Sequence, residues 1–141
     1  IKKSIKIKEN TSIADVRSFI KRVNKSRDDT YNFIKKEIKN NKKIFLYGAS
    51  TKGNTILQYF KINKNLISYA AERSPEKWGK YTVGTGIEII SEEKARELNP
   101  DYFLVMPWGF LNEFIKREKK WLKAGGKFVV PFPKFRIVGE K

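Results

Sequence analysis

The spacing of apolar residues predicts a long helix at the start of the chain. Apolar side chains recur three or four positions apart over residues 13–38, which indicates one helical stripe ending near Asn41. Ser12 and Asp15 form a capping box where this helix should begin. Residues 4–8 (SIKIK) instead alternate polar and apolar, which favours a short strand.

From residue 43 onward, short apolar runs alternate with helical patterns. The runs typical of strands are 43–47, 66–71, 102–106 and 127–130, with a brief extended piece at 87–90. The helices predicted between them are 53–60, a helix capped by Ser91 and closed at Pro100, and 110–123. Such alternation implies right-handed crossovers between parallel strands. The predicted fold class is α/β: a Rossmann-like three-layer domain over 11–141 with a mainly parallel sheet, preceded by the long N-terminal helix.

Composition narrows the chemistry open to this chain. Its 141 residues fit one domain with a real core, since 40% are hydrophobic and 13% aromatic. It has no cysteine and no histidine, which excludes disulfides, thiol nucleophiles, imidazole catalysis and the usual structural zinc sites. No apolar run approaches the ~20 residues of a membrane span, and no signal-peptide pattern opens the sequence. The expected location is the cytoplasm, without a membrane partner.

The charge of +16 raises the alternative of a basic nucleic-acid-binding domain. Two features argue against it: the cations are 24 lysines against 7 arginines, and they are interleaved with acids along predicted helix faces. We therefore expect no nucleic-acid partner, although the charge would help to hold an anionic ligand.

The first candidate binding motif lies between a predicted strand and a predicted helix, at residues 47–54 (YGASTKGN). Small residues such as Gly48 let a ligand approach the backbone, and the following helix start presents free N–H groups to an anion. Ser50, Thr51, Lys52 and Asn54 add further polar groups. The motif is neither a Walker A loop nor a full GxGxxG, and a glycine-rich turn is also common in this fold for structural reasons alone.

The second and third motifs follow the next predicted strand. Glu72 stands where a doubly wound fold commonly holds a ribose hydroxyl, or it simply pairs with Arg73. In the glycine-rich loop beyond it, Trp78 beside Lys77 could stack on a base and meet a phosphate, or cover the core. The fourth motif, Pro107 with Trp108, comes at the carboxyl end of the strand 102–106, where ligands of such sheets bind.

Together these motifs lie in three segments: YGASTKGNTILQYF (47–60), AAERSPEKWGKYTVGTGIEIISEEKARELNPDYFLVMPWGF (70–110) and EFIKREKKWLKAGGKFVVPFP (113–133). In order and spacing, residues 44–133 closely resemble the C-terminal domain of the S-adenosylmethionine-dependent sugar C-methyltransferase family. That family methylates carbon atoms of nucleotide-diphosphate sugars, typically deoxythymidine-diphosphate keto-deoxysugars. The resemblance implies that this domain binds the sugar nucleotide, whereas an upstream domain of the same protein binds S-adenosylmethionine.

The resemblance also implies which parts belong elsewhere. Residues 1–10 would be a remnant strand and linker of the upstream methyltransferase domain, which holds the acid–base residues, so no catalytic and no metal-binding residue is assigned here and the isolated chain should be inactive. Within this domain, the geometry of the predicted fold suggests that residues 48–54 would take the diphosphate, Glu72 a sugar hydroxyl, and Trp78 or Trp108 the base. Gly109 departs from the family, which often has histidine there. The alternative is a stand-alone nucleotide-binding module without methyl transfer.

Overall fold

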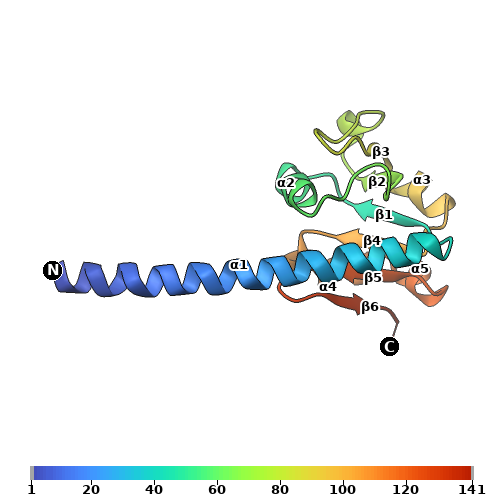
Figure 1. The fold of residues 1–141 in the computed structure, drawn as a ribbon. Coiled ribbons are helices and arrows are strands. Elements are labelled where there is room, and N and C mark those ends of the chain that lie inside the picture. Colours follow the sequence, from blue (N-terminus) through green and yellow to red (C-terminus); the bar gives the residue numbers. More distant parts are fainter. Residues whose placement is uncertain (1, 141) are drawn as a thin grey trace.

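The computed structural model describes residues 2–140, with side chains from Ser12 to Glu140. A long helix, α1 (Lys2–Lys39), precedes a six-stranded sheet that has helices on both faces (Figure 1). The strands are β1 (Ile44–Tyr47), β2 (Tyr69–Glu72), β3 (Glu88–Ser91), β4 (Tyr102–Val105), β5 (Lys127–Val130) and β6 (Arg136–Val138). The remaining helices are α2 (Thr51–Tyr59), α3 (Glu92–Glu97), α4 (Leu111–Arg117), α5 (Lys119–Lys123) and the 3₁₀ turns η1 (Pro75–Lys77) and η2 (Trp108–Phe110). No helix in this part of the chain has the length and apolarity to cross a membrane.

The sheet order is β3-β2-β1-β4-β5-β6, and all neighbours are parallel except the pair β5–β6. This order is that of a doubly wound dinucleotide-binding sheet, here with an antiparallel edge strand. β1 lies in the middle of the sheet, with β2 on one side of it and β4 on the other. After β1 the chain builds β2 and β3 on the first side, and it then crosses over to build β4, β5 and β6 on the second side. The carboxyl ends of β1 and β4 therefore form the topological switch point, with Tyr47 and Val105 in register there.

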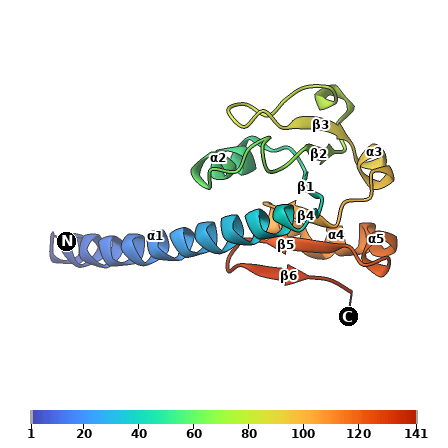
Figure 2. The ribbon, with the colours of Figure 1, turned by 45° about the vertical axis from the view of Figure 1, so that its right-hand side comes forward.

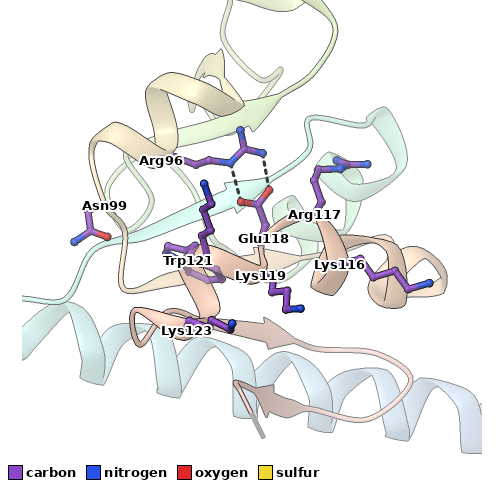
Figure 3. A pocket seen from close by; sticks show the side chains of 9 residues that line it. Arg96, Asn99, Lys116, Arg117, Glu118, Lys119, Trp121 and Lys123 are labelled. Atoms are coloured by element: carbon purple, nitrogen blue, oxygen red, sulfur yellow. Dashed lines mark hydrogen bonds and ion pairs between the residues drawn. The ribbon is translucent and has the colours of Figure 1, made fainter.

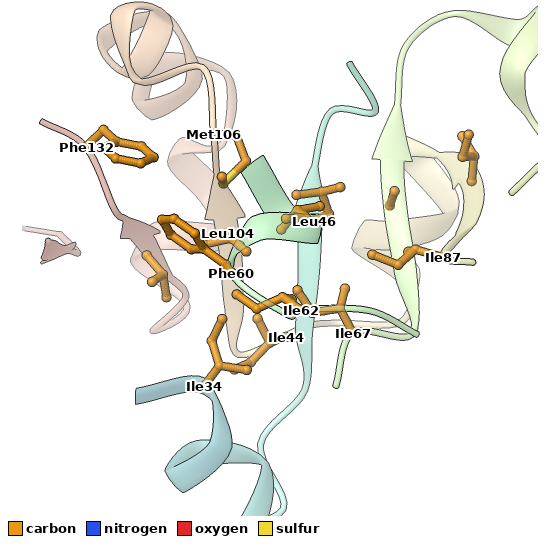
Figure 4. Packing of buried hydrophobic residues seen from close by; sticks show 14 residues of the cluster. Ile34, Ile44, Leu46, Phe60, Ile62, Ile67, Ile87, Leu104, Met106 and Phe132 are labelled. Carbon is orange, nitrogen blue, oxygen red and sulfur yellow. The ribbon is translucent and has the colours of Figure 1, made fainter. Parts of the chain in front are cut away.

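Alternation along the strands divides the core into two clusters, one on each face of the sheet. Under α1 and α2 the cluster is mostly aliphatic and includes Ile34, Leu57 and Leu104 (Figure 4). Under α3, α4 and α5 it is rich in aromatic rings, with Phe103 and Trp121 at its centre. These two clusters confirm the predicted three-layer α/β fold.

The structure corrects the prediction for the start of the chain. The strand expected at 4–8 and the helix start expected at Ser12 are wrong, because α1 is already helical from Lys2. A helix satisfies its own backbone hydrogen bonds, whereas a strand needs a partner, and the sheet of this chain has none beside these residues. The boundary predicted between residues 10 and 11 falls inside α1. The N-terminal half of α1 extends past the sheet (Figures 1 and 2), and four large apolar side chains described there are exposed: Ile13, Val16, Phe19 and Ile20.

Three other elements differ from the predicted pattern. The single helix expected at 110–123 is divided into α4 and α5, because the backbone of Glu118 leaves helical geometry at φ −101° and ψ 26°. The segment 74–86 is not simply a loop, since Tyr81 bridges to Glu88 of β3 in antiparallel fashion. The pattern gave no signal for β6, whose three residues are too few to show a period.

Candidate functional site

A pocket of about 380 Å³ lies at the switch point, between the start of α2 and the segment that follows β4. We call it the Lys52 pocket, because Lys52 is the single charged residue in its lining. Exposed aromatic side chains, Trp108 and Phe110, stand at its rim. Its lining is Ser50, Lys52, Gly53, Ile56 and residues 106–110. A cation beside aromatic rings and a helix start suits an anionic ligand that carries a ring.

Local sequence explains how the chain builds this pocket. Gly48 adopts φ +86°, a left-handed conformation that favours glycine, and this turns the chain from β1 toward α2. The hydroxyl of Ser50 accepts a hydrogen bond of 3.0 Å from the Gly53 N–H and caps α2. A Cβ atom on Gly53 would come within 3.2 Å of Met106 Cβ, so glycine at this position lets α2 approach β4 closely.

A second pocket, of about 240 Å³, opens on the other side of the same edge, and Pro107 and Phe110 line both pockets. We call it the Arg117 pocket. It contains charged groups of both signs, at the end of β2, at the start of α3 and along α4. The lining residues are Tyr47, Gly48, Ala71, Glu72, Arg73, Glu92, Pro107, Phe110, Glu113, Phe114 and Arg117.

A hydrogen-bonded network of charges lies directly behind the Arg117 pocket. Glu118, whose side chain is 1% exposed, accepts hydrogen bonds from Tyr47 Oη at 2.6 Å and from Arg96 Nε and Nη2 at 2.8 and 2.7 Å. Arg117 Nη1 donates to both Glu92 carboxylate oxygens at 3.3 Å and contacts Tyr47 Oη at 3.4 Å. These contacts fix the phenol and the guanidinium at the end of β1.

The network changes the acidity of its members. Burial raises the pKa of Glu118, but the hydrogen bonds from Arg96 and Tyr47 lower it by more, so the pKa lies below its ordinary value. Burial, and then the hydrogen bond to Glu118, raise the pKa of the Tyr47 phenol far above its ordinary value. Glu118 is therefore a carboxylate and Tyr47 a neutral hydrogen-bond donor at neutral pH.

The structure brings six of the ten predicted site residues to the two pockets. Ser50, Lys52 and Trp108 line the Lys52 pocket, Gly48 and Glu72 line the Arg117 pocket, and Pro107 lines both.

The other four line neither pocket, and three of them make structural contacts. Asn54 donates to the Val83 carbonyl and accepts from Thr85, which anchors the loop before β3 to α2. Lys77 Nζ lies 3.0 Å from Glu72 Oε1, and the Trp78 indole donates to the Glu72 carbonyl at 2.7 Å. Thr51 is exposed at the first position of α2.

Sequence reasoning did not assign Arg117, Glu92 or Tyr47 to the site. One signal was present, because Glu118 stands four residues after Phe114 and three before Trp121, on the apolar side of the predicted helix. A lone acid at such a position indicates a buried carboxylate, which requires cationic or hydroxyl partners. Nothing in the sequence identified Arg96 and Tyr47 as those partners.

A larger hollow of about 870 Å³ lies between α3 and α5, near the amino ends of the strands (Figure 3). We call it the basic groove, since its lining is mainly cationic: Arg96, Asn99, Lys116, Arg117, Glu118, Lys119, Lys120, Trp121 and Lys123. It shares only Arg117 with the Arg117 pocket, and none of its lining comes from the segments that directly follow the strands, where ligands of doubly wound sheets bind. We therefore assign the candidate site to the two smaller pockets.

The strand order and the switch point at the ends of β1 and β4 define a Rossmann-like α/β domain. The family model of the C-methyltransferase C-terminal domain matches residues 4–133, and the chain belongs to this family. It is also similar to C-methyltransferase NovU of Streptomyces niveus, with 37% identity over 92 residues. That match covers 65% of this chain and 22% of the relative. These findings confirm the family resemblance seen in the sequence.

Proposed function

We propose that this domain binds the nucleotide-diphosphate sugar substrate of an S-adenosylmethionine-dependent C-methyltransferase that acts on a keto-deoxysugar. The observation that carries the proposal is the Lys52 pocket: one cation, a capped helix start and exposed aromatic rings at the switch point. The diphosphate would lie beside Lys52 and the N–H groups of α2, with Trp108 against the ring of the base. The similarity to a C-methyltransferase supports the reaction class.

The methyl donor would be bound by an upstream domain and supplies the methyl group. S-adenosylmethionine carries a sulfonium cation, and the Lys52 ammonium would repel it from this pocket. This chain would instead bind and position the sugar nucleotide, which holds the reacting carbon in attack geometry. The N-terminal half of α1 extends beyond the carboxyl edge of the sheet, where the upstream domain would have to meet the substrate (Figure 1).

Calorimetric titration of the chain with a thymidine-diphosphate hexose tests the proposal. A charge-assisted contact contributes about 1.5–3 kcal/mol, so Lys52→Ala should weaken binding about tenfold or more. Lys36→Ala is the matched control, because it removes the same charge from an exposed position at the far end of α1. If both substitutions weakened binding equally, binding would depend on overall charge and not on the Lys52 pocket. If Lys52→Ala left the affinity unchanged, Lys52 would not be part of the site.

Further titrations and a DNA-retention experiment separate the alternative functions. Tight binding of S-adenosylmethionine by this chain would contradict the division of labour between domains. A stand-alone nucleotide-binding module would bind nucleoside diphosphates without any gain from the sugar. A nucleic-acid-binding domain would be retained on DNA and released steeply by salt.

A further inference from the structure

The Arg117 guanidinium is held in place on three sides. Glu92 binds its Nη1 atom, Tyr47 lies 3.4 Å from the same atom, and the Phe114 ring lies 5.3 Å from its central carbon. Within the described residues all hydrogen bonds of Arg117 use Nη1, so Nη2 and Nε keep their donors for a ligand. The side chain is 25% exposed, which leaves it partly desolvated but reachable from the pocket.

Packing alone does not require the charged network behind Arg117. A buried carboxylate such as Glu118 needs full compensation, and replacing buried ion pairs by apolar residues often leaves stability unchanged or improved. Figure 3 shows Arg96 reaching Glu118 from α3, whereas Arg117 and Lys116 leave α4 in different directions. The geometric result is that Glu118 and Tyr47 hold Arg117 at the carboxyl edge of the sheet.

The charges of the Arg117 pocket determine which ligand fits it. Three carboxylates, Glu72, Glu92 and Glu113, face two guanidinium groups, those of Arg73 and Arg117. Two of these carboxylates are already paired, Glu72 with Lys77 and Glu92 with Arg73, Arg96 and Arg117. The pocket is therefore close to neutral overall, in contrast to the Lys52 pocket, whose one charged residue is a cation. A neutral group with hydroxyl and carbonyl oxygens can donate to carboxylates and accept from guanidinium groups at once. The volume of about 240 Å³ equals about eight waters, at roughly 30 Å³ each, enough for one sugar ring.

We propose that the Arg117 pocket is the sugar subsite, in which Arg117 donates to oxygen atoms of the hexose and Glu92 accepts from a hydroxyl. Tyr47, Glu118 and Arg96 are positioning residues that act through Arg117. This inference rests on the proposed function, because the diphosphate in the Lys52 pocket would lead the sugar past Pro107 and Phe110, which line both pockets.

The test compares thymidine diphosphate with thymidine-diphosphate glucose by calorimetric titration of the 141-residue chain. Arg117→Gln should lower the affinity for the hexose nucleotide about tenfold and leave the affinity for thymidine diphosphate unchanged. Lys116→Gln is the matched control: it removes the same charge from the neighbouring residue, which lines the basic groove and not the Arg117 pocket. It should affect neither ligand.

Thermal unfolding of each variant shows whether it is folded, and Glu92→Gln serves as a second variant with nearly the same shape. Glu92→Gln should also lower the affinity for thymidine-diphosphate glucose and leave the affinity for thymidine diphosphate unchanged. Equal losses for both ligands, or no loss in either variant, would overturn the sugar subsite. Equal affinities of the unaltered chain for the two ligands would also overturn it and leave nucleotide binding intact. Binding of neither ligand would overturn the proposed function itself.

Discussion

The two faces of the sheet are built in different ways. The face under α1 and α2 is packed with aliphatic side chains such as Leu57 and Leu104, and the segments that meet there are far apart in sequence. The face under α3, α4 and α5 has aromatic rings and, near the end of β1, the Glu118 network. Both faces bury strands of the same sheet, so strand burial does not explain the difference.

The difference shows which face carries chemistry. An apolar core stabilises without directional contacts, whereas buried charges stabilise little and impose geometry. The charged groups lie where β1 ends, next to the Arg117 pocket. We infer that the aliphatic face mainly provides stability. The aromatic face contributes less stability, because part of it consists of polar groups that are held in fixed positions beside the site. Four measurements test this comparison.

The largest effect should come from the aliphatic face. Leu104 is fully buried in β4, and Leu104→Ala should lower the free energy of unfolding by about 3–4 kcal/mol through lost burial and the cavity left behind. Urea denaturation followed by circular dichroism measures this. Val83→Ala is the control, since Val83 is 80% exposed and its truncation should cost almost nothing. A loss below that of Glu118→Gln would contradict the assignment of stability to this face.

The next effect comes from the buried carboxylate. Glu118→Gln should cost about 2 kcal/mol, less than the roughly 3–5 kcal/mol typical of a broken buried pair, because Arg96 is 40% exposed and can turn to water. The same denaturation experiment measures it, with Glu113→Gln as the exposed control on the same helical segment. If Glu118→Gln raised stability, the network would be a net cost that only function explains.

A smaller effect concerns pH. The folded-state pKa of Glu118 is depressed, so its contribution is fully present above the unfolded pKa of about 4.3 and is lost as pH falls through the folded pKa. The melting temperatures of the unaltered chain and Glu118→Gln should therefore differ at pH 7 and converge toward pH 3. A constant difference across this range would show that the charge of Glu118 is not what stabilises the fold.

The smallest effect should be a gain on the aliphatic face. The Thr30 hydroxyl is buried without a hydrogen-bond partner among the described residues, four positions before Ile34 on α1. Thr30→Val replaces it with a methyl group of similar shape and should stabilise by about 0.5–1 kcal/mol. Thr30→Ser keeps the hydroxyl and should destabilise. A loss of stability in Thr30→Val would point to a partner for the hydroxyl.

The sequence predicted the sheet well because each main strand is a short apolar run between turn residues. Ser91, for example, caps α3 as predicted by accepting a hydrogen bond of 3.0 Å from Lys94. The pattern failed where a partner decides the structure: residues 4–8 have no strand beside them, and β6 depends on pairing with β5.

The candidate site was predicted only in part, for a similar reason. Lys52 and Trp108 follow strand ends, which parallel topology brings to one edge, and the structure places both in one pocket. Asn54 and Trp78 occur in equally suitable local sequence, yet their polar atoms bind neighbouring loops. Arg117 lies within a helix, and only its tertiary contacts with Glu92 and Tyr47 bring it to the edge.

Two of the three tryptophans, Trp108 and Trp121, occupy distinct environments, which gives the domain intrinsic optical reporters. Trp121 is 7% exposed and packs against Phe103 and Phe128, so its fluorescence emission will follow global unfolding. Trp108 is 42% exposed at the rim of the Lys52 pocket, so a ligand that covers it will shift its emission toward the blue. Occupancy of the site and integrity of the fold can therefore both be followed in one unlabelled sample through tryptophan emission.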